Sequence, residues 1–348
     1  MKKSKKEYPF ILNGKILEHV TFFKYLGITF NYNGRFNVGV RDLKVQGRRA
    51  MFSLLQKCRM LQLPISVQLE LFNSLVQPIL TYSCEVWGYS NVDIIESLQL
   101  EFLEYIMNMK KSTPSCLVYG ESGQFPLYIH VYCRMVIFWH KLIMNNENKM
   151  SKSILKTLYE CHKFNIYKSE WLDKIKHILD TCGLSYIWEN PINVTTSWLK
   201  NKIVLILKDM FIQTWTQQCS DVNKSCNYNL YKTSFGFESY LDNLPSCYRI
   251  PLTKLRTSNH KLPIEKGRYI NLPREERTCN LCNLSNIGDE YHFLLECPVL
   301  SDLRSKFIPK YYSKHPNFYK YSELLSLKNH NKILKLSKFV KAGLSLFK

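Results

Sequence analysis

Residues 278–298 read TCNLCNLSNIGDEYHFLLECP and contain the most specific pattern in the chain. Cys279, Cys282, His292 and Cys297 follow the spacing C-x2-C-x9-H-x4-C. A C-x2-C step directs two thiolates at one point, and the later histidine and cysteine complete a tetrahedron of three sulfurs and one nitrogen. The four side chains therefore predict one closed, structural Zn²⁺ site, a C-terminal zinc knuckle.

The residues around these ligands agree with that prediction. Gly288 and Asp289 predict a turn before His292, and Pro298 biases Cys297 away from helical dihedral angles. His292 and Cys297 are five positions apart and cannot share a face of a regular α-helix, so the helix begun by YHFLL should end before Cys297. The alternative is that some of the 12 cysteines fall close together by chance and that His292 is a core residue.

The charge of the chain changes on either side of the ligands. Residues 279–300 contain three acidic residues and no lysine or arginine. Residues 249–278 carry eight basic and three acidic residues, a net of +5, and residues 301–348 carry eleven and two, a net of +9. The knuckle is therefore expected to hold two basic flanks in register rather than to bind phosphate itself.

The whole chain of 348 residues has a formal net charge of +20, which favours a polyanionic partner, nucleic acid before an anionic membrane. It opens with MKKSKKEY rather than an apolar signal, and it contains no apolar window of about 18 residues. We expect a protein that is intracellular, nuclear or cytoplasmic and not secreted, with reduced cysteines and no membrane partner.

Apolar periodicity predicts a mainly α fold with a small N-terminal β unit. Asn13-Gly14 lies between two apolar runs and predicts a hairpin, followed by a third strand over Phe22–Phe30. Ser66 is expected to cap the second of the helices, and Pro78 to kink it. The expected helices cover residues 38–60, 66–88, 92–109, 127–144, 169–183 and 196–218, the last with a buried stripe of Trp198, Val204, Leu207, Phe211 and Trp215.

Five units are expected along the chain: a β unit (1–36), a thumb-like helical bundle (37–150), a helical connector (151–248), a basic segment with the zinc knuckle (249–310) and a basic helical tail (311–348). A few strands without a covering layer do not form an independent fold. The chain is therefore expected to begin in the middle of a domain, with apolar strand faces that need a partner.

Four blocks of sequence follow one another in an order that resembles a known family. The blocks are FKYLGITF (23–30), VQPILTYSCEVWG (76–88), KKSTP with VYGESGQFPL (110–127), and LPREERTCNLC with DEYHFLLECP (272–298). Together they resemble the C-terminal half of a non-LTR (LINE-type) retrotransposon reverse transcriptase, an RNA-directed DNA polymerase. The resemblance implies that FKYLG is the last palm strand, that the helices of residues 38–145 are the thumb, and that the four ligands are the family's zinc knuckle.

The sequence departs from that family at the catalytic site. The family holds two metal ions with a Tyr/Phe-x-Asp-Asp turn and an upstream aspartate, because in-line phosphoryl transfer needs paired carboxylates. This sequence contains no Asp-Asp pair, and by the resemblance the active-site turn would lie before residue 1. We therefore expect a nucleic-acid-binding fragment that lacks the palm site and is not an enzyme on its own.

Two groups of basic residues are the candidate contacts to RNA, to an RNA–DNA hybrid or to a DNA duplex. Such contacts would meet phosphates and give affinity without sequence readout, and a solvated surface role is the alternative for each. The groups are a thumb-helix set of Arg41, Lys44, Arg48 and Arg49 and a pre-knuckle set of Lys254, Arg256, Lys261, Lys266, Arg268, Arg274 and Arg277.

Other functions remain open from the sequence. The protein would be a zinc-dependent nucleic-acid or protein-interaction adaptor if a host has retained it, or a non-functional transposon-derived product if it has not. A separate palm-containing polypeptide would be a further partner.

Overall fold

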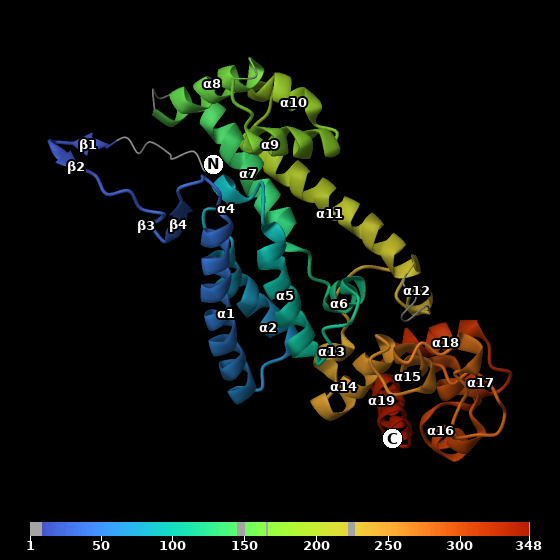
Figure 1. Ribbon diagram of the computed structural model, residues 1–348. Coiled ribbons are helices and arrows are strands. Elements are labelled where there is room, and N and C mark those ends of the chain that lie inside the picture. The colour runs from blue at the N-terminus through green and yellow to red at the C-terminus, as the bar shows by residue number, and fades with distance from the viewer. Residues whose placement is uncertain (1–8, 145–149, 165, 222–226, 348) are drawn as a thin grey trace.

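The structure is a computed structural model that describes residues 9–144, 150–164, 166–221 and 227–347. It is mainly helical, with two small hairpins at the N-terminus (Figure 1), which confirms the expected fold class.

The strands are β1 (Ile11–Leu12), β2 (Lys15–Ile16), β3 (Phe22–Tyr25) and β4 (Ile28–Asn31). The helices up to residue 193 are α1 (Asn37–Met60), α2 (Ile65–Leu71), the π-helical η1 (Phe72–Val76), α3 (Gln77–Leu80), α4 (Cys84–Trp87), α5 (Val92–Met107), α6 (Ser115–Ser122), α7 (Leu127–Met144), α8 (Met150–Lys163), α9 (Glu170–Thr181), α10 (Ser185–Glu189) and the 3-10 turn η2 (Pro191–Asn193). The later helices are α11 (Thr196–Asp221), α12 (Tyr228–Tyr231), α13 (Tyr240–Asn243), α14 (Ser246–Arg256), α15 (Pro263–Tyr269), η3 (Arg274–Glu276), η4 (His292–Glu296), η5 (Pro298–Leu300), α16 (Ser301–Phe307), α17 (Lys310–Ser313), α18 (Phe318–Leu325) and α19 (His330–Leu344).

The N-terminal strands form two separate hairpins. The turn between β1 and β2 is made by Asn13 and Gly14, both with positive φ, as the sequence predicts. The single strand expected over Phe22–Phe30 is wrong, because the chain reverses at Leu26 and Gly27 (φ +45° and +87°) and pairs β3 with β4. The Tyr82 hydroxyl donates to the Leu26 carbonyl at 2.8 Å and fixes this turn against the bundle.

Only β4 joins the core. Every described residue from 9 to 27 is exposed, whereas Ile28 is buried against α1. The contact is close at Gly39, where a Cβ would lie 2.7 Å from the Thr29 carbonyl oxygen. The Thr29 hydroxyl also donates to Asp42 of α1 at 2.6 Å. The β1–β2 hairpin projects away from the bundle, whereas β3 stays beside β4 (Figure 1).

The first part of the bundle follows the predicted periodicity except at one helix. Leu43, Met51, Leu54 and Leu55 of α1 are buried. The helix expected over 66–88 is broken into α2, η1, α3 and α4, because Pro78 has no N–H to continue the ladder and Ser83 adopts a positive φ of 52°. Ser66 does not cap α2, since Pro64 occupies the N-cap position.

The longest helix, α11, connects the two ends of the molecule. It packs along α7 and runs from the α8–α10 end to the C-terminal part (Figure 1). Of the stripe predicted for it, Leu207, Phe211 and Trp215 are buried and Val204 is half-buried, but Trp198 is 42% exposed. Ser169 caps α9, because its hydroxyl accepts a hydrogen bond from the Leu172 amide.

The C-terminal part is a compact set of short helices around α19. α14 and α16 pack against α19, and α12 packs against α18. Phe293 and Leu294 of the knuckle are buried, and the Phe293 ring lies 5.4 Å from the Phe339 ring of α19 between centroids. In the part of the chain that is described, no helix combines the length and apolar character needed to cross a bilayer.

Candidate metal centre

A short two-stranded turn positions the first two cysteines. Thr278 and Ile287 form an antiparallel bridge, and the Cys279 amide donates to the Asn286 carbonyl at 2.8 Å. The chain between them reverses, with Ser285 at a φ of +53°. Cys279 and Cys282 therefore sit at the start and the tip of one tight reversal, where a C-x2-C step directs both thiols inward.

A π-helical turn positions the other two ligands. η4 covers His292–Glu296, and the Cys297 amide donates to the His292 carbonyl at 2.8 Å, an i to i+5 bond. The helix ends before Cys297, as predicted. The five-residue separation excludes a shared face only in an α-helix, and the wider π turn brings residues five apart to nearly the same side.

The four ligand atoms are close enough to share one ion. All of them lie within 4.8 Å of one another. The Cys279 and Cys297 sulfurs are 4.0 Å apart, and the Cys282 sulfur is 3.4 Å from His292 Nε2. Since Zn–S bonds of about 2.3 Å give tetrahedral S–S separations of about 3.8 Å, the group is compatible with one zinc ion.

The neighbouring residues hold the ligands in this arrangement. His292 Nδ1 lies 3.3 Å from a Glu296 carboxylate oxygen, which leaves Nε2 directed at the sulfurs. The His292 amide donates to Asp289 at 2.9 Å and fixes the start of the turn. The buried Arg304 donates to the carbonyls of Leu294 and Cys297 at 2.8 and 2.9 Å and closes its end. Sequence reasoning missed Glu296 and Arg304, although the His-x3-Glu spacing was a signal for the first.

The thiols need a cation to ionise together. Burial, followed by the nearby Cys279 thiol, raises the pKa of Cys297 to about 11. The Cys297 thiol is thus protonated at neutral pH when no cation is bound. A cation among the sulfurs favours the thiolates, so metal binding at this site releases protons.

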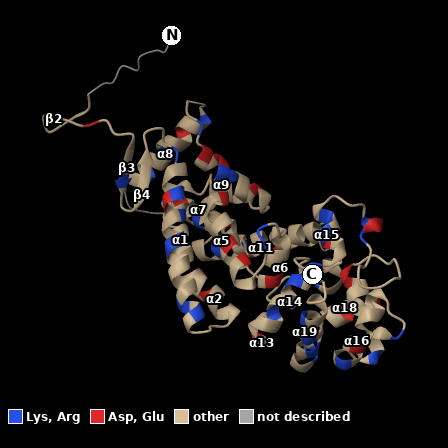
Figure 2. Ribbon diagram, turned by 60° about the horizontal axis from the view of Figure 1, so that its bottom comes forward, with Lys and Arg blue, Asp and Glu red and all other residues tan. Residues whose placement is uncertain are grey.

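The structure places the thumb-helix set on the exposed side of α1. Figure 2 shows the basic positions along α1 and, in the C-terminal part, on α14 and α19. Arg48 forms an ion pair with Glu101 of α5, and Lys44 donates to Ser97 of α5 at 2.6 Å. Arg41 and Arg49 are exposed and have no ion pair within the described residues.

Arg256 is not a surface contact, so its assignment to phosphate binding is wrong. Its side chain is 3% exposed, and its guanidinium donates to both oxygens of the buried Glu121 at 2.9 to 3.1 Å. It also donates to the Leu325 carbonyl at 2.6 Å. Glu121 lies on α6, 135 positions earlier, so nothing local in the sequence marks this burial.

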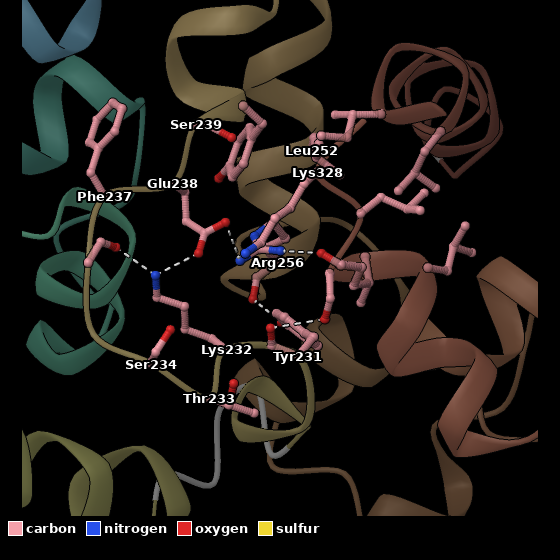
Figure 3. A pocket seen from close by; sticks show the side chains of 18 residues that line it. Tyr231, Lys232, Thr233, Ser234, Phe237, Glu238, Ser239, Leu252, Arg256 and Lys328 are labelled. Carbon is pink, nitrogen blue, oxygen red and sulfur yellow. Dashed lines mark hydrogen bonds and ion pairs between the residues drawn. The ribbon is translucent and has the colours of Figure 1, made fainter. Parts of the chain in front are cut away.

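Arg256 belongs to a set of charges that we term the charge cluster: the buried Glu121, Lys232 and Arg256 and the half-buried Glu238. Figure 3 shows Glu238 between Lys232 and Arg256, at 2.6 Å from the Lys232 ammonium and 3.3 Å from the guanidinium. Lys232 also donates to the Gly236 carbonyl at 2.6 Å. Although a cavity of about 430 Å³ adjoins these groups, their charges compensate one another, which indicates a structural role.

The rest of the pre-knuckle set divides into two kinds. Arg268 pairs with Glu265 at 2.9 Å and Arg274 with Asp289 at 3.7 Å. Arg277 donates to the carbonyls of Leu272 and Ile264 at 2.8 and 3.3 Å, so these three arginines hold the knuckle and its neighbours together. Lys254 is half-buried, and Lys261 and Lys266 are exposed.

Comparisons with known proteins add no relative. Neither the protein-family profiles, nor the curated proteins, nor the solved structures contain a match to this chain. The resemblance to a LINE-type reverse transcriptase therefore depends on the four sequence blocks alone and stays a prediction.

Proposed function

We propose that the chain is a noncatalytic nucleic-acid-binding protein whose C-terminal part is held by one structural Zn²⁺ on Cys279, Cys282, His292 and Cys297. Its partner would be RNA, an RNA–DNA hybrid or a DNA duplex, contacted through phosphates. The observation that carries the proposal is the Cys3His group between two strongly basic flanks. In this proposal the chain corresponds to the thumb and knuckle of a LINE-type reverse transcriptase without its palm site.

The ligand set favours a structural ion over a catalytic one. The protein supplies four ligands, which fill a tetrahedral shell and leave no position for water or substrate. Cys279, His292 and Cys297 are buried and Cys282 is half-buried. Such a site contributes to folding instead of activating a nucleophile.

The exposed basic residues support phosphate binding. Arg41 and Arg49 project from one helix, and Lys261 and Lys266 lie on the segment before the knuckle. Because a duplex releases counterions when its phosphates meet cations, binding through these residues would weaken steeply with salt.

A second candidate function is docking to a separate palm-containing polypeptide. The observation that favours it is the exposure of Phe22, Phe23 and Tyr25 on β3, each more than half exposed. An exposed apolar strand offers unpaired edge groups and a surface for another chain. This function is compatible with nucleic-acid binding elsewhere on the molecule.

The first experiment combines zinc content with a fluorescence titration against an RNA–DNA hybrid at several salt concentrations. We expect one zinc per chain and steeply salt-dependent binding. The double variant Arg41→Glu/Arg49→Glu should lower the salt slope by about 0.9 per lost contact, as on duplex DNA. Lys163→Glu/Lys176→Glu makes the same charge change at exposed positions of α8 and α9 and serves as the control.

Each result bears on a separate part of the proposal. Absence of zinc from reduced protein never exposed to chelator would overturn the metal site. Zinc without salt-dependent binding would overturn the nucleic-acid function. An equal loss of slope in both double variants would remove α1 from the binding surface.

A further inference from the structure

A second cavity, of about 600 Å³, lies where three distant segments meet. Its cationic lining is Lys110 from the loop after α5, Lys254 from α14, Lys261 from the loop before α15, and Lys341 from α19. Two of these lysines belong to the predicted pre-knuckle set. Lys110 and Lys341 are outside that set, because they are distant from it in the sequence. The fold alone brings them to the cavity.

The charge of this cavity is not compensated. No aspartate or glutamate is among its lining residues. Within the described ranges, no carboxylate oxygen lies within 4.0 Å of any of the four ammonium groups. Lys110 and Lys341 instead lie over the rings of Tyr269 and Tyr248, at 5.2 and 4.9 Å from the ring centroids. The cavity beside the charge cluster differs, because there each buried cation meets a carboxylate. Four lysine side chains around one hollow, with no carboxylate partner among the described residues, favour an anionic ligand.

The cavity also has an apolar wall. Ile250 and Pro251 of α14 face it together with Leu344 and Phe347 at the end of α19. An inorganic anion would use the lysines alone, whereas a ligand with a flat, weakly polar body beside its negative charge would use both surfaces. A nucleotide has this combination, and the volume is in the range of about 300–1,000 Å³ of small-ligand pockets.

The polar residues of the lining hold its shape. His260 Nε2 lies 2.8 Å from the buried Glu290, and His260 Nδ1 accepts a hydrogen bond from the Leu262 amide at 3.2 Å. Asn259 accepts a hydrogen bond from Thr113 at 3.1 Å, which ties this loop to the segment that carries Lys110. Glu290 precedes the ligand His292 by two positions, so the same loop that holds the metal supports the pocket.

We propose that this pocket binds one phosphate-bearing nucleotide, with the phosphate on the lysines and the base on the apolar wall. The middle of a nucleic-acid strand needs an open surface on which its backbone can continue in both directions. A cavity enclosed by three segments instead suits the end of a strand. The ligand would be the phosphorylated end of a nucleic-acid strand, or a free mononucleotide of the same chemistry. The inference rests on the proposed function, because it names how the basic C-terminal part meets nucleic acid.

The test uses the full zinc-loaded chain and short single-stranded oligonucleotides with a 5′-phosphate, a 3′-phosphate or only hydroxyl ends. We expect one of the phosphorylated forms to bind about tenfold or more tightly than the hydroxyl form, as for a hydrogen bond to a charged group. Lys254→Glu and Lys341→Glu should abolish that preference. Lys335→Glu, an exposed residue of α19 outside the pocket, should keep it, and Lys110→Glu repeats the test from a separate segment.

Competition with AMP separates the two sources of the ligand. Displacement of the oligonucleotide by AMP at comparable concentration would support a free nucleotide, and failure of AMP to displace it would support a strand end. Salt-dependent binding without an end preference would overturn the pocket and leave the proposed function intact. Equal effects of Lys335→Glu and Lys254→Glu would also overturn it, as would tighter binding to phosphoinositide vesicles. Absence of all oligonucleotide binding would overturn the proposed function as well.

Discussion

The candidate metal centre and the charge cluster both place ionisable side chains away from water, but they differ in what compensates the charge. Each buries ionisable side chains and ties separate segments together. The metal centre takes its ligands from residues 279–297, and its three thiols have no cationic side chain among them. The charge cluster brings together residues that lie as far apart as 121 and 256, and it contains two carboxylates and two cations. In the proposed function the first is completed by a metal ion from solution, whereas the second is complete in the chain. The stability of the metal centre should therefore depend on the metal in the solution, and that of the charge cluster should not.

Loss of the metal should give the largest effect. Chelation, or Cys282→Ser, should remove the ion and the protection of amides around 278–297 in hydrogen exchange. Structural zinc supplies on the order of 10 kcal/mol in small peptides at neutral pH, and the packed Phe293 and Leu294 should retain part of the fold here. Cys247→Ser, at an exposed free cysteine, is the control. Equal exchange in both variants would mean that the ligands are ordinary core residues.

Arg256→Met should give the next largest effect. It leaves the Glu121 carboxylate buried without its main cation, and breaking such a pair costs about 3–5 kcal/mol. Urea unfolding measures the loss, and Glu121→Gln combined with Arg256→Met should recover part of it. Arg48→Met removes an ion pair with Glu101 in which both side chains are partly exposed, and it should cost no more than about 1 kcal/mol. If the single and double variants are equally unstable, packing rather than charge explains the loss.

As the pH is lowered, the metal centre should lose its ion before the charge cluster loses its contribution to stability. Burial raises the pKa of Glu238, but the charges of Arg256 and Lys232 outweigh it and lower the pKa overall. Its contribution to stability is therefore present above the unfolded pKa of about 4.3 and is lost as pH falls through the lower folded value. Protons compete with metal for the thiolates at higher pH. Zinc release, followed by a chromophoric chelator, should precede the loss of unfolding free energy, and Glu238→Gln should flatten only the later change. Simultaneous loss would mean that the two regions unfold as one unit.

Smaller effects than those at Arg256 are expected from two buried tyrosines. The Tyr240 hydroxyl donates to Glu121 at 2.6 Å, so Tyr240→Phe should cost about 1.5–3 kcal/mol. The Tyr228 hydroxyl is buried and has no hydrogen-bond partner among the described residues. Tyr228→Phe should leave the unfolding free energy unchanged or raise it slightly. Thermal unfolding of both variants makes the comparison, and a similar loss in each would show that ring packing, not the hydrogen bond, sets the cost.

The same two regions show what the sequence could predict. The four metal ligands are close in the chain, so their spacing alone places them together. The helices α1, α5, α7 and α9 follow from local periodicity and caps. The burial of Arg256 depends on a carboxylate 135 positions away, and the pocket depends on Lys110 meeting Lys341. Neither contact leaves a periodic or local pattern in the sequence. Arg256, which lies in a basic stretch, was therefore predicted to be a surface residue.

The π turn of η4 has a consequence for the direction of the chain. An α-helix turns by about 100° per residue. One additional residue in a helical turn therefore rotates the chain after that turn by about the same angle. The x4 gap between His292 and Cys297 is one residue longer than the spacing that faces one side of an α-helix, and the π turn accommodates it while both side chains reach the same site. η5 and α16 follow this turn directly and α16 packs against α19, so we expect the turn to influence the direction in which the C-terminal helices leave the centre. Deleting one residue there would suit an ordinary α-helical turn and would misdirect the C-terminal 50 or so residues, as estimated from the rotation per residue.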